Sequence, residues 1–182
     1  MSQKKVAQMK KIRRGILSAI CRMISMGSPS NSGPLICTGM VRNELDIIDT
    51  WISHLCSIFD KVIIFDHLSS DGTLERLGEL SLIYKNLELR QFTSQGHNQA
   101  SLMTSVFKEV SSEISAGWMF FLDADEFLMI KDKWALGDLL SKYRAATTVC
   151  FLWANAYPVN ATHTISSDTN IEGWVNGSHR VP

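Results

Sequence analysis

Three acidic side chains follow directly on a short, wholly apolar run. The run is Trp118–Leu122, and Asp123, Asp125 and Glu126 come after it. A short unbroken apolar run predicts a strand buried on both faces, as in the middle of a parallel sheet. Carboxylates at the end of such a strand lie at the sheet edge where ligands bind in open α/β folds, and Mg²⁺ and Mn²⁺ prefer their oxygens. The stretch therefore predicts a divalent cation that holds a phosphate-bearing ligand, against the plainer interpretation of a buried strand and an acidic turn.

Two other predicted strands also end in polar residues. Leu35–Val41 is followed by Arg42-Asn43-Glu44, and Lys61–Asp66 is followed by a turn that contains Asp71-Gly72, a strong turn dipeptide. The carboxyl ends of parallel strands meet at one edge of a sheet. These residues are therefore candidates for the same site as the acidic stretch.

Helices are expected between the strands, because apolar residues there repeat at three- and four-residue steps. They are predicted after Glu44, from Thr73, over Asn98–Ser115 and over Ala135–Tyr143, with further strands at Leu87–Gln91 and Thr147–Ala156. Strands that alternate with helices imply the α/β class and a mostly parallel sheet built of right-handed crossover units.

The charges of the 182-residue chain are segregated although the formal net charge is zero. Of the 18 basic groups, seven lie in residues 1–35, which hold no acid, so the remainder carries 11 basic against 18 acidic groups. An acidic body argues against nucleic acid as a partner, since nucleic-acid binding needs a basic footprint. Cys21, Cys37, Cys56 and Cys150 form no closely spaced pair, which indicates a reduced compartment and a cytoplasmic protein.

Residues 1–34 form a basic arm and a linker by composition. Two interpretations of residues 10–26 stay open: a leader without fixed structure, or a basic amphipathic helix that contacts the inner face of a membrane peripherally. Residues 27–34 are rich in Gly, Ser and Pro and indicate a linker. The ordered domain is accordingly predicted over residues 35–156.

Several chemistries are excluded by missing motifs. The sequence has no G-x-x-x-x-G-K-[ST], no G-x-G-x-x-G after the first strand and no G-x-S-x-G. The histidines lack metal-ligand spacing. His54 is expected to be structural inside a helix, whereas His67 and His97 lie in predicted loops at strand ends, where they either line a cleft or serve only the fold.

Together, the three strand-end motifs resemble the ordered motifs of family 2-like glycosyltransferases, in particular the branch similar to family 92. The motifs are Thr38-Gly-Met-Val-Arg-Asn-Glu44, Phe65-Asp-His-Leu-Ser-Ser-Asp-Gly-Thr73 and Phe121-Leu-Asp-Ala-Asp-Glu-Phe-Leu128. Each motif is weak alone, but three in this order at plausible spacing are a specific signal. The resemblance covers about residues 35–156. It implies a GT-A fold, a Rossmann-like α/β sheet that binds a nucleotide-sugar.

The resemblance also implies roles for residues at the motif positions. On the nucleoside side, Val41, Arg42 and Glu44 would border the nucleoside. Asp66 would bond to the base or the ribose, in a pocket shaped by the turn that contains Asp71.

On the phosphate side, Asn98 and Gln99 lie where the family often contacts the nucleotide. Asp123 would face the ribose or the metal, and Asp125 would bind the Mn²⁺ or Mg²⁺ that bridges the diphosphate. A bound cation acts as a Lewis acid on the departing diphosphate, and two carboxylates leave open coordination positions for phosphate oxygens.

Two features depart from the family pattern. Asp66-His67 stands where many relatives have two acids or Asp-Asn, which leaves the base open. The family places its acceptor site and catalytic base in a C-terminal half, of which residues 157–182 are expected to be only the beginning. The chain is therefore expected to be truncated, with its acceptor glycan and catalytic base unassigned.

Three hypotheses for function follow from these residues. The main one is an inverting glycosyltransferase that uses a nucleotide-diphospho-sugar and a divalent metal. The alternatives are a non-catalytic nucleotide-sugar-binding remnant or partner subunit, and a metal-dependent phosphohydrolase that uses the carboxylates directly.

Overall fold

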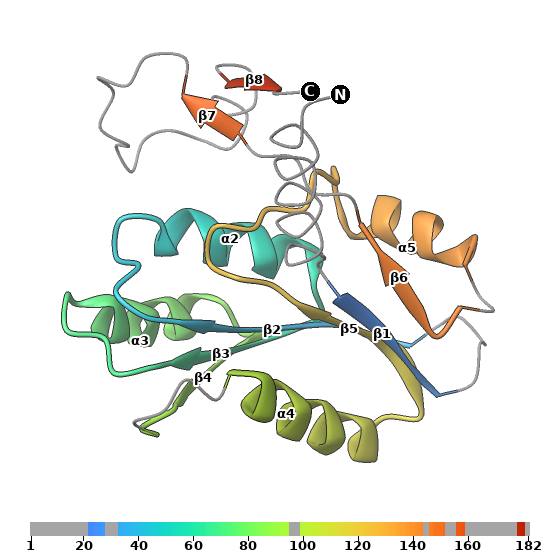
Figure 1. Cartoon of the computed structure of the whole chain (residues 1–182), viewed down its shortest axis with the longest axis horizontal. Helices are drawn as coiled ribbons and strands as arrows, with labels where there is room; N and C mark the ends of the chain where they lie inside the picture. Colours follow the sequence, from blue (N-terminus) through green and yellow to red (C-terminus); the bar gives the residue numbers. More distant parts are fainter. Residues whose placement is uncertain are drawn as a thin grey trace, which may run out of the picture.

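A six-stranded mixed sheet forms the centre of the molecule (Figure 1). The computed structural model describes residues 22–27, 33–94, 99–143, 146–151, 156–158 and 178–180. The sheet order is β4-β3-β2-β5-β1-β6, in which β2, β3, β4 and β5 are parallel and β1 pairs antiparallel with both β5 and β6. The strands are β1 (Arg22–Gly27), β2 (Leu35–Val41), β3 (Lys61–Asp66), β4 (Leu87–Gln91), β5 (Ala116–Phe121) and β6 (Thr148–Cys150).

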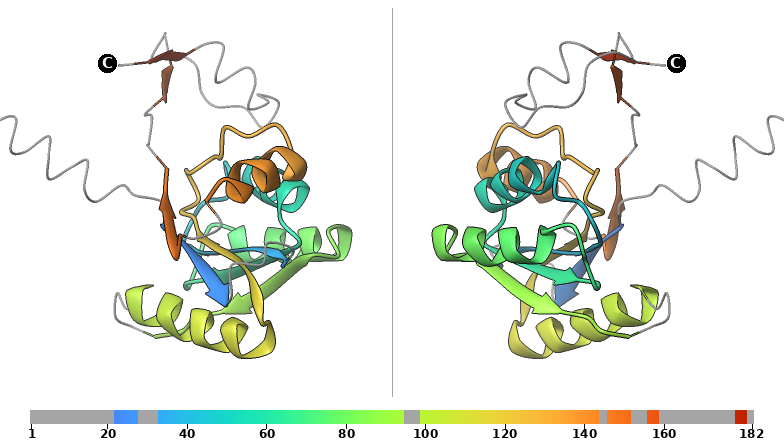
Figure 2. Two further views of the ribbon diagram at one scale, coloured as in Figure 1. Left: turned by 90° about the vertical axis from the view of Figure 1, so that its right-hand side faces the viewer. Right: turned by 90° about the vertical axis from the view of Figure 1, so that its left-hand side faces the viewer.

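Helices cover both faces of this sheet (Figures 1 and 2). One face is covered by α4, and α2, α3 and α5 lie on the other. The helices are α2 (Ile48–Ile58), α3 (Thr73–Ile83), α4 (Gln99–Glu113) and α5 (Lys133–Ser141). A separate two-stranded sheet pairs β7 (Ala156–Pro158) with β8 (Ser178–Arg180). Within the described part of the chain, no helix has the length and apolar character needed to cross a bilayer.

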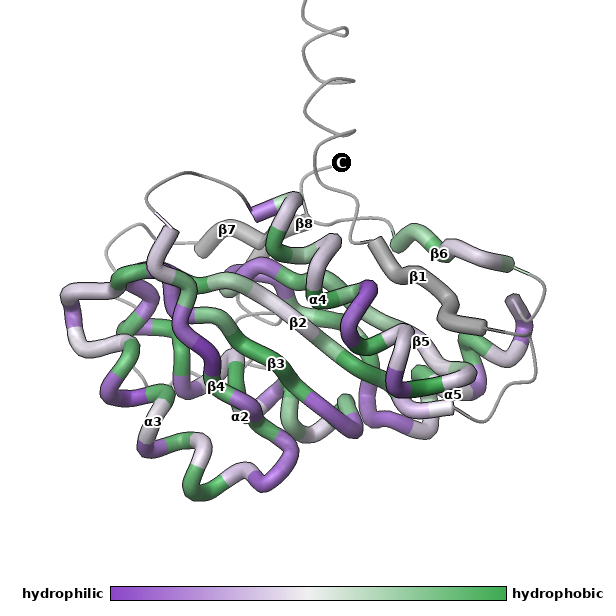
Figure 3. The backbone as a smooth tube through the Cα atoms, turned by 90° about the horizontal axis from the view of Figure 1, so that it is seen from below, coloured by the Kyte–Doolittle hydropathy of each residue, from purple (hydrophilic) through white to green (hydrophobic). Residues whose placement is uncertain are grey.

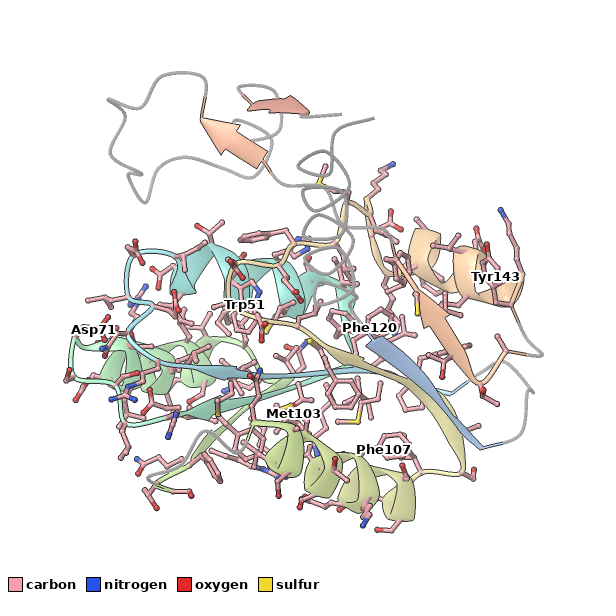
Figure 4. All side chains as sticks on the ribbon, in the orientation of Figure 1. Trp51, Asp71, Met103, Phe107, Phe120 and Tyr143 are labelled. Atoms are coloured by element: carbon pink, nitrogen blue, oxygen red, sulfur yellow. The ribbon has the colours of Figure 1, made fainter. Side chains whose placement is uncertain are left out.

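Apolar side chains fill the layers on both sides of the sheet, and the central strands are the most continuously hydrophobic part of the backbone (Figure 3). Trp51 of α2 and Phe120 of β5 are fully buried in the larger cluster. On the opposite face, Met103 and Phe107 of α4 pack against a smaller cluster (Figure 4). Because β5 contributes to both clusters, its burial on two faces explains its unbroken apolar sequence.

The predicted α/β class, with a mostly parallel sheet between helices, is confirmed. Val41 of β2 stands opposite Asp66 of β3, and Thr38 of β2 stands opposite Phe121 of β5. The carboxyl ends of β2, β3 and β5 therefore meet at one edge of the sheet, on the left of Figure 1. The loops that follow these strands, with their polar residues, therefore begin next to one another.

The interpretation of residues 10–26 as an amphipathic helix is wrong for its described part. Residues 22–27 form β1, which pairs antiparallel with β5 and with β6, and residues 10–21 lie outside the described residues. The sheet therefore begins before residue 35. The reason is long-range: without β1, the outer backbone groups of β5 would lack partners, and pairing overrides a weak local helical pattern.

The segment after α5 also differs from the prediction. A strand was expected over Thr147–Ala156, but β6 spans only Thr148–Cys150, and residues 152–155 lie outside the described residues. Its short length suits an edge strand, which presents unpaired backbone groups to solvent.

Gly39 in the middle of β2 permits a close approach of the backbone after β5. A Cβ at this position would lie 2.5 Å from the Leu122 carbonyl oxygen and 2.9 Å from the ring of Trp51. Because one of these neighbours is backbone in a packed sheet, we expect Gly39→Ala to lower the free energy of unfolding by about 1–3 kcal/mol, as overpacked cores do. Urea denaturation measures the change.

Gly78→Ala is the matched control. Gly78 lies within α3, and an added Cβ there meets nothing within 4 Å. Because alanine is the better helix former, this variant should gain about 0.5–1 kcal/mol. Equal stabilisation by both substitutions would contradict the close contact at Gly39.

Candidate functional site

An open cavity of about 290 Å³ lies at the carboxyl edge of the parallel strands. Its walls come from the end of β2, from the residue after β3, from the start of α4 and from the segment after β5. The lining residues are Met40, Val41, Arg42, Glu44, His67, Gln99, Asp123, Ala124 and Asp125.

Most of the predicted site residues meet at this cavity. The six that line it are Val41, Arg42, Glu44, Gln99, Asp123 and Asp125. Asp66 and Asp71 do not line it, and Asn98 and His97 lie outside the described residues. His67 lines the cavity, which answers the question left open for that residue in favour of a cleft position.

The segment Leu122–Leu128, here called the acidic loop, presents two of its three carboxylates to the cavity. Asp123 and Asp125 are exposed and line it. Glu126 turns back instead: its Oε2 accepts from the Asp123 backbone N–H at 3.1 Å, while its own N–H donates to the Asp123 carbonyl at 2.9 Å. Glu126 thus closes the turn that presents the two aspartates, and Gln99 Nε2 donates to Asp123 Oδ1 at 2.9 Å.

Two side chains of α2 hold the downstream end of the acidic loop. Trp51 Nε1 donates to the Glu126 carbonyl at 3.1 Å, and the Leu128 backbone N–H donates to His54 Nε2 at 3.2 Å. The His54 ring also lies 5.4 Å from the Phe127 ring, centroid to centroid. The upstream end is held by β2, since the Leu122 N–H donates to the Thr38 carbonyl at 3.1 Å.

The sequence predicted a structural role for His54 inside a helix, but it did not reveal what the rings of Trp51 and His54 bond to. Trp51 is fully buried, and burial lowers the pKa of His54. The available signal was their spacing of three residues, which places both rings on one face of α2.

The loop after β2 is tied to the turn after β3. Glu44 N–H donates to Thr73 Oγ1 at 2.9 Å, and Asn43 exchanges bonds with the same turn through its N–H and its side-chain oxygen. Asp71 lies at the left end of the molecule in Figure 4, where its carboxylate accepts from the Leu45 N–H and from the N–H and hydroxyl of Thr73. Asp71 therefore braces the loop that carries Glu44 and lies away from the cavity lining.

Asp66 pairs with the cavity-lining Val41 at the ends of β3 and β2 and is 2% exposed. Its Oδ2 accepts from the Ser69 N–H at 3.2 Å, whereas its Oδ1 is buried without a hydrogen-bond partner among the described residues. The neighbouring His67 donates from Nε2 to the Ser94 carbonyl at 2.9 Å and lies against Phe92. An unpaired buried carboxylate oxygen is costly, so Asp66 Oδ1 stands out among the polar atoms near the cavity.

Negative charge accumulates around the cavity. Burial first, then the charges of Asp46 and Asp125, raise the pKa of Glu44. Burial also raises the pKa of Glu126 to about 7. A hydrogen bond from the Asp123 backbone lowers this pKa, and the charges of Asp123 and Asp125 raise it. Such crowding of carboxylates is relieved when a cation binds between them.

The cavity fits a divalent cation only if a ligand completes the coordination. Among the described residues, no group of three or more His, Cys, Asp or Glu is placed to hold a metal ion alone. The two exposed carboxylates, Asp123 and Asp125, match the usual Mg²⁺ arrangement of one or two carboxylates plus phosphate oxygens and waters. The donor set is all oxygen, which suits Mg²⁺ and Mn²⁺.

Comparisons with known proteins found similarity in structure but none in sequence. No protein-family model matches the chain, and no curated protein shows significant similarity to it. Among solved structures it is similar to the mannosyltransferase PcManGT from Pyrobaculum calidifontis, determined in complex with GDP-Man and Mn²⁺. The match has 16% identity and a TM-score of 0.47 and covers 63% of this chain and 33% of that chain, so this chain spans about a third of that protein's length. A likeness at this level carries no argument about function.

The His54 contact predicts how stability depends on pH. Nε2 accepts a hydrogen bond only in the neutral ring, and burial holds the pKa of His54 below 6.5. The unfolded chain therefore binds a proton more readily, so the contribution of neutral His54 is fully present above pH 6.5 and is lost as pH falls towards the folded pKa. Urea denaturation between pH 8 and 5 should show this loss.

His54→Gln supplies the control, because its side-chain oxygen can accept from Leu128 N–H but does not titrate. As the pH falls, the unfolding free energy of wild type should decrease more than that of His54→Gln. A difference that stays constant with pH would contradict a neutral His54 acceptor.

Proposed function

We propose that the cavity binds a nucleoside-diphospho-sugar through a divalent cation and that the protein is a glycosyltransferase. The observation that carries the proposal is the convergence of three strand-end motifs on one cavity. Residues from all three motifs line it: Val41, Arg42 and Glu44 from the first, His67 from the second, and Asp123 and Asp125 from the third. These motifs resemble those of family 2-like glycosyltransferases in the order in which they occur.

The chain's own residues divide into a nucleoside side and a phosphate side. Val41, Arg42 and Glu44 border the nucleoside, and the buried Asp66 lies beside Val41 at the end of β3, with one oxygen that lacks a hydrogen-bond partner among the described residues. Asp123 and Asp125 hold the Mn²⁺ or Mg²⁺, and Gln99 fixes the Asp123 carboxylate by its amide N–H. The cation supplies Lewis-acid stabilisation of the diphosphate as it leaves.

The acidic character of the site makes the cation necessary for binding. Carboxylates at the cavity and the phosphates of a donor carry the same sign of charge, so a donor without a cation is repelled. Two carboxylates with open coordination positions suit a phosphate ligand better than an all-protein metal cage. The same arrangement favours phosphate binding over a structural metal site.

Substitution of Asp125 tests the binding part of the proposal. Asp125→Asn removes one direct ligand, so the Mn²⁺-dependent affinity for a nucleoside diphosphate should fall by more than the roughly 10–100-fold that outer-shell changes cost. The free energy of unfolding should change by no more than about 0.5 kcal/mol, because the side chain is exposed. Calorimetry with UDP and GDP, with Mn²⁺ or with EDTA, measures the affinity.

Asp46→Asn is the matched control. Asp46 is exposed and contributes negative charge to the surroundings of Glu44, but it does not line the cavity. The Asp46→Asn substitution removes one negative charge, as Asp125→Asn does, but it removes no metal ligand. Mn²⁺-dependent binding should therefore persist. Equal losses in both variants would point to general charge instead of coordination and would contradict the assignment of Asp125.

Turnover separates the glycosyltransferase from the other two hypotheses. Release of nucleoside diphosphate from a nucleotide-sugar in the presence of an acceptor, on the order of 1 s⁻¹ or faster, is expected of a complete enzyme. Donor binding without release would favour the non-catalytic binding protein. Hydrolysis of simple phosphate esters would favour the phosphohydrolase.

A further inference from the structure

The acidic loop has no strand or helix of its own, so its position depends on side-chain anchors. Residues 122–130 carry no regular secondary structure. The two aspartates lie in a segment that is fixed at both ends. Leu122 is hydrogen-bonded to β2 on one side, and Glu126 and Leu128 are hydrogen-bonded to α2 on the other. A change at either end would alter where the carboxylates stand.

The two anchors on α2 differ in kind. Trp51 is buried in the core and packs against Gly39, so its removal would damage the whole layer between α2 and the sheet. His54 is only partly buried, and its contacts with the loop are one hydrogen bond to Leu128 and a ring contact with Phe127. His54 is therefore the anchor that can be changed while the core stays intact.

We propose that His54 is a positioning residue for the cation site: its Nε2 holds the Leu128 N–H and so keeps the acidic loop, with Asp125, at the edge of the cavity. This inference rests on the proposed function, because it concerns the cation that Asp123 and Asp125 would hold. His54 itself is absent from the cavity lining, so it acts through the loop backbone and touches no ligand.

The chemistry of the bond explains why this position suits histidine. Leu128 N–H is a backbone donor beside an apolar cluster that includes Leu128 itself and Leu136. A buried donor without a partner is costly, and a neutral imidazole supplies an acceptor with little polar surface. The same ring covers Phe127, so one side chain satisfies the backbone and packs the loop.

Two substitutions separate the hydrogen bond from the packing. His54→Gln retains an acceptor near the position of Nε2, whereas His54→Leu retains apolar packing against Phe127 and removes the acceptor. Asn86→Leu is the control at the C-terminal end of α2, where Asn86 Nδ2 donates to the carbonyls of Cys56 and Phe59. The control loses helix-end hydrogen bonds and stability without touching the acidic loop.

The first readout needs no cation. Amide hydrogen exchange followed by NMR should show the Leu128 amide exchanging about tenfold faster in His54→Leu than in wild type, because a hydrogen bond of this kind is lost. His54→Gln should restore the protection, and Asn86→Leu should leave Leu128 unchanged relative to its neighbours in the loop. Unchanged exchange at Leu128 in His54→Leu would overturn the proposal.

The second readout is the affinity for Mn²⁺, measured by electron paramagnetic resonance on the full chain in the presence of UDP or GDP. His54→Leu should weaken Mn²⁺ binding about 10–100-fold, the usual effect of losing a group that orients a metal ligand, and His54→Gln should restore it to within about threefold. Asn86→Leu should bind Mn²⁺ as wild type does. Equal affinity in His54→Leu and wild type, or equal losses in His54→Leu and Asn86→Leu, would overturn the positioning role.

Failure of the proposed function has a different signature. If wild type bound no Mn²⁺ with either nucleotide, the cation site would be wrong and His54 would position no such site. The exchange of Leu128 would then show a loop anchor without a metal role, which also refutes the inference.

Discussion

Carboxylates that repel one another are held together at the carboxyl edge of the sheet, and this constraint governs the rest of the structure. Burial, with the charges of neighbouring aspartates adding to it, raises the pKa of Glu44 and of Glu126. The free energy for holding them comes from elsewhere: the parallel register of β2 with β5, and the bonds from α2 to the acidic loop. The site is a set of mutually unfavourable charges supported by a well-packed α/β core.

The strands and the meeting of their ends were predictable from the sequence. The runs that end at Val41, Asp66 and Leu122 are apolar because both faces of their strands are buried. Such a run can be recognised from the residues of the strand alone. Since parallel strands end at one edge, the convergence of Glu44 with Asp123 followed without knowledge of any contact. The lining of the cavity confirms that part of the prediction.

What the sequence did not reveal depends on where individual atoms point. Asp71 was grouped with the binding residues because it lies in a motif, but its carboxylate serves backbone donors across two loops. The apolar pattern of α2 shows that Trp51 and His54 face inward, yet it does not say that their nitrogens meet the acidic loop. β1 pairs with β5, some ninety positions further along the chain. The periodicity of a short segment does not indicate a partner that is so distant in the sequence.

A crystal of the full chain grown with Mn²⁺ and a nucleoside diphosphate tests the central claim most directly, through the anomalous signal of manganese. The account predicts one anomalous peak at the cavity, coordinated by Asp125, with Asp123 adjacent and the remaining positions taken by diphosphate oxygens and water. A nucleotide bound at the cavity without manganese, or manganese bound away from both aspartates, would contradict it.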